Sequence, residues 1–305
     1  MFPSFACKLF RMLFTILHFE ICILHLRFRE VSKISTIISQ VTDFSKLNMW
    51  ADLIGVVLVL MAFGQFWSMH LVGNLLTGRL QERFIDGNWH PAPHLLPASP
   101  KIMHGMHLAG MIGLGLSGLY IRVPYFGGAR TVMRFVHYAC AYVVTINFVA
   151  RIYYAYAVDA KEFFITKKDL FAMPTQMKYL FFMLPVEKEP SFGKYNPMQR
   201  LTYFGLIPGP LILMVVTGFS MLWPQVILAP IAPFVGGIAA AAAYARVIHF
   251  LMCMMLIMTT MIHMYLAITE NFPGLLDFFG IKPFTEEDIE AHNLAHGGHG
   301  GHGSH

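Results

Sequence analysis

Charged residues are scarce in this chain. Aspartate, glutamate, lysine and arginine make up 13% of its 305 residues, whereas a soluble globular protein has about 25%. The net charge of +5 is small and is carried by segments between apolar runs. A basic excess in that position bears on membrane orientation, and it gives no support to a partner made of nucleic acid.

Cysteine and the common catalytic motifs are equally sparse. The four cysteines are scattered and form no CxxC or CxxCH pair, which excludes a thiolate metal site and covalent c-type haem attachment. No phosphate-binding loop, GxGxxG or GxSxG pattern occurs, so nucleotide and hydrolase chemistry have no support. The cysteines are Cys7, Cys22, Cys140 and Cys253.

Long apolar runs are what the chain does have. Hydrophobic residues make up 56% of it, and several runs reach the roughly 20 residues that a membrane-spanning helix needs. The sequence therefore predicts an all-α integral membrane protein, a four-helix transmembrane bundle with one extra N-terminal helix. The expected spans are Trp50–Leu76, Ile102–Val123, Thr131–Val158, Leu201–Trp223 and Ala245–Asn271.

The two ends of the chain stand apart from this bundle. Residues 1–48 are too broken for a confident span and lack a signal-peptide cleavage site, so we interpret them as an extension upstream of a true start at Met49. Residues 49–100 hold the extra helix and a loop, and 101–271 hold the bundle. Residues 272–305 are expected to be a cytoplasmic tail, first acidic and then rich in histidine and glycine.

The last span carries two histidines, His249 and His263, fourteen positions apart. On a helix that spacing returns to nearly the same face, about 21 Å farther along the axis. Ionisable residues at membrane depth are costly, and a functional role is their default interpretation. The two histidines are interpreted either as ligands of two stacked metal centres or as buried, hydrogen-bonded side chains without a functional role.

Other polar side chains occur in the second and third spans. His104 and His107 lie near the start of the second span, and His137 lies near the start of the third. Arg151 follows fourteen residues after His137, deep enough to need an anionic partner such as a haem propionate, or to reach the interface.

Charge in the connecting segments predicts the orientation. The loop from Asp159 to Arg200 has seven lysines or arginines. The positive-inside rule therefore predicts that this loop and the C-terminus lie on the cytoplasmic side of a bacterial or archaeal inner membrane. The histidines then fall at two depths: His137 with His249 on the outer side, and either His104 or His107 with His263 on the inner side. Each pair suits bis-imidazole coordination of haem iron between facing helices.

The stretch from Lys101 to Asn271 resembles a known family, the b-type cytochrome subunits of membrane-bound nickel–iron hydrogenases. Formate dehydrogenase gamma subunits and thiosulfate reductase cytochromes are relatives in the same cytochrome b561-like superfamily. The family's first ligand helix begins Arg-x-x-His-Trp and reaches Thr-Gly fourteen residues after that histidine. Lys101, His104 and Ser117-Gly118 occupy those places here, whereas Gly105 replaces the tryptophan.

Three further stretches carry the resemblance. RFVHYACAYVV with ARIYYAY looks like the family's second ligand helix, with His137 as ligand and Arg151 at a typical arginine. YNPMQRLTYFGL looks like the start of its histidine-free helix, and RVIHFLMCMMLIMTTMIHMYLAI like its last helix, with His249 and His263 at the family's spacing. The extra helix lies outside the family's four-helix core.

The resemblance implies cofactors and partners. It implies two non-covalent haems b, one held by His137 and His249 and the other by His104 and His263, with His107 as the alternative inner ligand and Arg151 as a propionate partner. Electrons from hydrogen would pass from the catalytic large subunit and the iron–sulfur small subunit of a nickel–iron hydrogenase to the haems and then to quinone. The chain would thus be an electron-transfer subunit and not the catalytic one.

Two other functions fit some of the same residues. The cytochrome would serve a formate dehydrogenase, a thiosulfate reductase or a related molybdenum enzyme if its partner differed. A transition-metal transporter would also place histidines inside the membrane, but it usually needs acidic groups at the midplane, and these spans are nearly free of them.

Overall fold

The computed structural model describes residues 44–87, 89, 97–158, 160, 164–182, 184 and 195–295. This part of the chain is helical, and five of its helices are long and apolar enough to cross a membrane. The protein is therefore an all-α integral membrane protein, as the sequence predicts. The spans are Lys46–Leu76, Ala98–Arg122, Arg130–Ala157, Pro197–Leu222 and Ile238–Glu270. The first four lie within four residues of their predicted bounds, and the last begins seven residues earlier than predicted.

Three spans are single helices and two are interrupted. The single helices are α6 (Ala98–Arg122), α7 (Arg130–Ala157) and α14 (Ile238–Glu270). The first span is built from α3 (Phe44–Met61), the π-helical η2 (Ala62–Ser68) and α4 (Met69–Leu76). The fourth is built from α10 (Pro197–Leu201), the π-helical η4 (Thr202–Leu206) and α11 (Pro208–Leu222).

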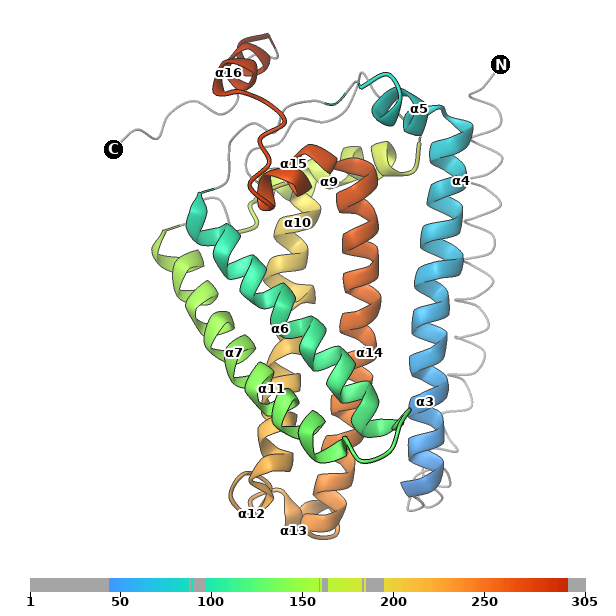
Figure 1. The fold of residues 1–305 in the computed structure, drawn as a ribbon, viewed down its shortest axis with the longest axis vertical. Helices are drawn as coiled ribbons and strands as arrows, with labels where there is room; N and C mark the ends of the chain where they lie inside the picture. The colour runs from blue at the N-terminus through green and yellow to red at the C-terminus, as the bar shows by residue number, and fades with distance from the viewer. Residues whose placement is uncertain are drawn as a thin grey trace.

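Short helices lie at both ends of the bundle (Figure 1). One end, called the α15 end below, carries α5, α9 and α15, and the other, the α12 end, carries α12 and α13. Their bounds are Arg79–Phe84 for α5, Lys167–Leu180 for α9, Pro224–Ile227 for α12, Ala232–Val235 for α13 and Phe272–Phe278 for α15. A further helix, α16 (Glu286–Ala295), follows α15 beyond the bundle.

Successive spans run in opposite directions, so α6 and the α10–α11 span descend from the α15 end while α7 and α14 return to it (Figure 1). Within the bundle α6 packs along α7, and α11 packs along α14. Glycines of α6 allow it to approach α7 closely. A Cβ added to Gly110 would lie 2.5 Å from Val144, and one added to Gly113 would lie 2.5 Å from the sulfur of Cys140. Small residues at such crossings let helix backbones approach closely in a membrane.

Apolar side chains fill the centre of the bundle. Val144 of α7, Leu211 of α11 and Leu256 of α14 are buried against one another. Leu256 lies midway along α14 between His249 and His263, so this layer separates the two depths at which the histidines lie.

The extra N-terminal span packs against α14 and is fastened at both ends. At the α12 end Asp52 of α3 pairs with Arg122 of α6, whose guanidinium lies 3.9 Å from the ring centre of Phe250 on α14. At the α15 end Arg83 of α5 forms a buried ion pair with Glu270 of α14, at 2.9 Å. The proposed extension 1–48 lies outside the described residues except for its last five, which begin α3, and the glycine-rich end of the tail lies outside them as well.

Candidate functional site

Near the α12 end, His137 of α7 faces His249 of α14. Their ring centres are 6.3 Å apart and the ring planes are inclined by 63°. Both side chains are half-buried. The two histidines predicted to share the outer depth are therefore neighbours in space, although 112 positions separate them in the sequence.

A serine and a glycine on α6 position the first of these rings. Ser117 is buried and donates its hydroxyl proton to the carbonyl of Gly113, at 2.5 Å. Its oxygen therefore accepts from Nδ1 of His137, at 2.9 Å. A histidine whose Nδ1 carries the proton has Nε2 free as a metal ligand. Gly118 leaves room for the ring, because a Cβ there would lie 3.2 Å from it.

The same arrangement recurs on α11 for His249. Thr217 donates to the carbonyl of Leu213, at 2.5 Å, and accepts from Nδ1 of His249, at 3.0 Å. A Cβ added to Gly218 would also lie 3.2 Å from the imidazole. The histidine-free helix α11 therefore gives His249 a hydroxyl acceptor and a glycine beside its ring, as α6 does for His137. Both imidazoles then present Nε2 as a potential ligand.

Near the α15 end, His104 of α6 faces His263 of α14. Their ring centres are again 6.3 Å apart, with the planes inclined by 57°. Phe278 of α15 lies against His104, with ring centres 4.5 Å apart. His107 lies one turn deeper on α6, and it is His104 whose ring faces His263.

The two pairs are separated along one unbroken helix. Because α14 runs without interruption from Ile238 to Glu270, the fourteen positions between its histidines correspond to about 21 Å of rise. The buried layer around Leu256 lies between the pairs. The bundle thus holds two separate imidazole pairs, one above the other.

The spacing within each pair matches bis-imidazole coordination. A metal–imidazole bond of about 2 Å on each side of an iron, with about 1 Å more from each ring nitrogen to its ring centre, puts two ring centres about 6 Å apart. The glycine positions beside His137 and His249 leave space where a side chain would intrude. These residues fit a haem held by two histidines.

A multi-ligand site for a bare metal ion has less support. Within the described part of the chain, no three histidine, cysteine, aspartate or glutamate side chains converge. Transition-metal sites in proteins usually draw on three or four such ligands. Paired histidines are instead typical of a macrocycle that supplies the other four ligands itself.

Comparison with known proteins decides the family. The sequence profile described as "Prokaryotic cytochrome b561" matches residues 96–279, which include α6, α7, α11, α14 and α15. The chain belongs to this cytochrome b561 family. It is therefore a membrane electron-transfer protein of the b-type cytochromes, which bind haem b, and the resemblance seen in its sequence is confirmed.

Curated relatives agree with the family. The chain is 25% identical over 235 residues to a protein of Azotobacter vinelandii named "Probable Ni/Fe-hydrogenase B-type cytochrome subunit", with 67% of this chain and 90% of that one covered. Proteins with the same name from Azotobacter chroococcum and Cupriavidus necator are 26% and 22% identical, and cover 67% and 65% of this chain and 90% and 88% of their own lengths. No solved structure matches the chain significantly. The extra span lies outside the residues that match the cytochrome b561 profile.

The two cationic candidates near the α15 end have protein partners. Arg151 donates to the hydroxyl of Tyr195, at 3.1 Å, and lies over the ring of Tyr154. Lys101 forms an ion pair with Asp277 of α15, at 2.6 Å. Lys101, at the start of α6, thus ties α15 beside the His104–His263 pair, next to the contact between Phe278 and His104.

Sequence reasoning missed the threonine on α11. Ser117-Gly118 belongs to a motif of the family, whereas Thr217-Gly218 lies on a helix without histidines and no motif marks it. The signal in the sequence is the repeat itself: α7 with His137 and α14 with His249 each follow a membrane-spanning helix that has a hydroxyl residue and a glycine near its end.

Proposed function

We propose that this protein is the di-haem membrane anchor of a nickel–iron hydrogenase and carries electrons from hydrogen oxidation to the quinone pool. The observation that carries the proposal is the pair of facing imidazoles at each of two depths, each with ring centres 6.3 Å apart. The names of the curated relatives support the choice of partner.

In this proposal His137 and His249 hold the outer haem, and His104 and His263 hold the inner one. Two bound haems would supply one-electron carriers at the two depths. Ser117 and Thr217 keep the outer imidazoles in the tautomer that leaves Nε2 free, and the hydrogen bonds raise the basicity of both ligands. Arg151, on α7, is the propionate partner at the inner depth.

The overall reaction balances without a further reactant. Hydrogen gives two protons and two electrons at the partner's catalytic subunit, and the electrons pass through its iron–sulfur subunit to the outer depth. A quinone accepts the two electrons together with two protons and becomes quinol. The basic loop between α7 and α10 supports the assignment of the α15 end to the cytoplasmic side of a bacterial or archaeal inner membrane.

Spectroscopy of purified protein tests the haem content. We expect a reduced b-type spectrum with two haems per chain, and the loss of one haem in His104→Ala and in His249→Ala. His107→Ala is the matched control on α6 and is expected to retain both haems. A fully loaded wild-type protein with one haem, or His107→Ala losing a haem while His104→Ala keeps it, contradicts the assignment.

Hydrogen and formate distinguish the partners. When the native complex is isolated from the membrane, we expect hydrogen to reduce both haems and formate to reduce neither. Reduction by formate alone would assign the cytochrome to a molybdenum enzyme. Co-purification of an iron–sulfur subunit and a nickel-containing subunit is the corresponding protein-level result.

A further inference from the structure

A second polar site lies outside the haem-binding bundle, where the extra span meets α14. His70 and Asn74 of α4 are buried there, with 6% and 0% of their surfaces exposed. Asn74 donates to Nδ1 of His70, at 3.1 Å, and the hydroxyl of Tyr265 on α14 lies 3.0 Å from the same nitrogen. Because an amide N–H only donates, Nδ1 is the acceptor, and Nε2 of a neutral His70 carries the proton.

That N–H has no hydrogen-bond partner among the described residues. Oε1 of Glu270 lies 4.0 Å from Nε2, which is too long for a direct hydrogen bond and suits one bridging water. The side-chain oxygen of Asn74 is also without a partner. A donor, an acceptor and a carboxylate therefore converge at one buried point, which is the composition of a site that holds and passes protons.

Glu270 connects this point to the α15 end of the molecule. Its carboxylate is paired with Arg83 of α5, at 2.9 Å, and Arg83 also donates to the hydroxyl of Tyr179 on α9, at 2.6 Å. Both α5 and α9 belong to the connecting segments at that end (Figure 1). A chain of buried polar groups thus runs from the cluster toward the side that we assign to the cytoplasm.

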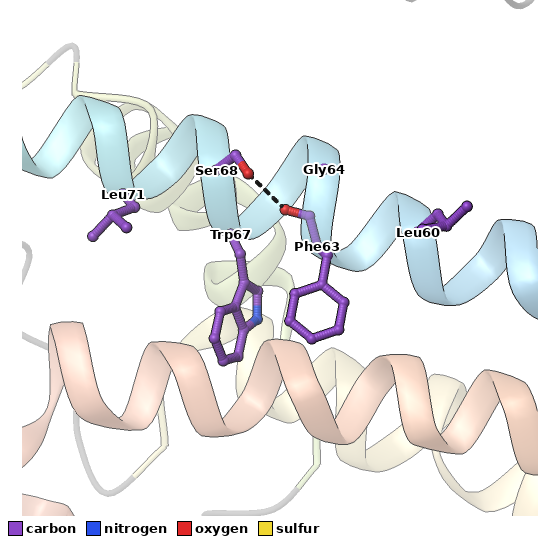
Figure 2. A pocket seen from close by; sticks show the side chains of 6 residues that line it. All are labelled: Leu60, Phe63, Gly64, Trp67, Ser68 and Leu71. Atoms are coloured by element: carbon purple, nitrogen blue, oxygen red, sulfur yellow. Dashed lines mark hydrogen bonds between the residues drawn. The ribbon is translucent and has the colours of Figure 1, made fainter.

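A pocket of about 340 Å³ adjoins the cluster on the extra span. Figure 2 shows Phe63 and Trp67 reaching from that span toward α14, with Leu60 and Leu71 farther along the span on either side of them. The leucines are 61% and 40% exposed, so the pocket is apolar and open toward lipid. Its full lining is Leu60, Phe63, Gly64, Trp67, Ser68 and Leu71.

Backbone irregularity accounts for this recess. Four of the lining residues belong to the π-helical η2, and such segments are frequent at functional sites. Gly64 contributes no side chain, and a Cβ added there would meet nothing within 4 Å. The pocket is therefore a gap in the helix surface that a larger residue at position 64 would fill without displacing its neighbours.

Trp67 joins the pocket to the buried cluster and to the inner imidazole pair. Its ring centre is 5.3 Å from that of Tyr265, and its indole N–H donates to the carbonyl of Met261, at 3.2 Å. His263 lies between those two α14 residues in the sequence and faces the other side of the helix toward His104. The pocket and the inner pair are thus at one depth, separated by a single helix about 10 Å in diameter.

We propose that this pocket binds a prenylated quinone, with the quinone ring beside Phe63 and Trp67 and the tail along the lipid-facing leucines. The inference rests on the proposed function, because it takes the electrons from the inner depth across α14. Each quinone carbonyl becomes a hydroxyl by gaining one electron and one proton. The protons enter from the α15 end and pass through Glu270 and His70, each of which takes up a proton before it releases one.

Filling the pocket tests quinone binding. In the intact complex, Gly64→Leu is expected to raise the quinone KM by about ten-fold or more, as overfilling an apolar site does, and to leave haem content and haem reduction by hydrogen unchanged. Gly209→Leu is the matched control, since Gly209 of α11 also has no atom within 4 Å of its added Cβ. Unchanged quinone kinetics in Gly64→Leu overturn the proposal.

Photo-labelling keeps the test independent of hydrogen oxidation. An azido-substituted decylquinone is expected to label the peptide containing Phe63 and Trp67 in the wild-type complex, and to lose that label in Gly64→Leu. Label on other peptides only overturns the proposal, even if the partner enzyme proves not to be a hydrogenase. Loss of partner subunits from Gly64→Leu would also overturn it, because the pocket would then seat a transmembrane helix.

The proton-bearing groups have their own readout. Glu270→Gln keeps the volume of the side chain but leaves it one acceptor oxygen in place of two and cannot carry a proton, and we expect quinol formation to slow by about 10²-fold while haem reduction stays normal. Glu270→Asp is expected to recover part of the rate. Equal rates in Glu270→Gln and wild type would remove Glu270 from the proton path.

Discussion

The hydrogen bond between His249 and Thr217 offers a sharp test of the outer haem site. Thr217→Val changes the side-chain volume little but removes the oxygen that accepts from Nδ1, at 3.0 Å. The ring keeps its place beside Gly218, so the substitution removes the acceptor and little else. The imidazole is then a less basic ligand.

The expected size follows from the strength of one hydrogen bond. A neutral bond of this kind contributes about 1 kcal/mol net, and a less basic ligand favours the reduced iron. Because a tenfold change in a one-electron equilibrium corresponds to about 59 mV, this free energy raises the potential of one haem by about 40 mV. The other haem, held at the α15 end, is expected to keep its potential.

A redox titration of the haem absorption bands measures both potentials in one experiment. Thr259→Val is the control, because the hydroxyl of Thr259 on α14 donates to the carbonyl of Met255, at 2.9 Å, one turn earlier on the same helix. It is expected to leave both haems unchanged. An equal shift of the two haems in Thr217→Val, no shift at all, or the same shift in the control would refute the role given to this threonine.

Three further predictions address the same structure. Gly218→Val places methyl groups against the ring of His249 and is expected to remove the outer haem while the inner remains, as pyridine haemochrome analysis can measure. Although burial raises the pKa of Asp169, hydrogen bonds from the N-cap threonine of α9 and from Arg200 lower this pKa overall. The ionised Asp169 therefore stabilises the fold above about pH 4, and this stabilisation is lost as the pH falls through the lowered pKa. Hydrogen exchange in α9 should speed up at low pH, and faster exchange at higher pH would contradict the prediction. Asp52→Ala breaks a half-exposed ion pair and is expected to cost less than about 1 kcal/mol in thermal unfolding, so a larger loss would mean that this clamp carries the extra span.

Much of the bundle followed from the sequence alone. The five spans are set by runs of apolar residues, because backbone groups inside a bilayer must be satisfied within a helix. The two depths of the histidines also followed, since the alternation of spans and the fixed rise per residue place each one along the membrane normal. For the same reason the sequence predicts His137 and His249 at one level in the membrane.

Packing decided what spacing left open. His104 and His107 lie one turn apart, and depth does not separate them; the rotation of α6 against α7, set by Gly110 and Gly113 meeting Val144 and Cys140, turns His104 toward His263. Linear spacing also contains no information about which hydroxyl reaches a ring. Thr217 matters only because α11 lies along α14.

The extra span also separates what the sequence predicts from what only tertiary packing decides. Its length and apolarity were evident from the sequence, and so was the presence of His70 within it. That His70 meets Asn74, Tyr265 and Glu270 at a buried point depends on how α4 lies against α14, because residues nearly 200 positions apart are brought into contact only by tertiary packing. Composition determined that this protein lies in a membrane and where its helices run, and helix rotation determined which polar groups meet inside it.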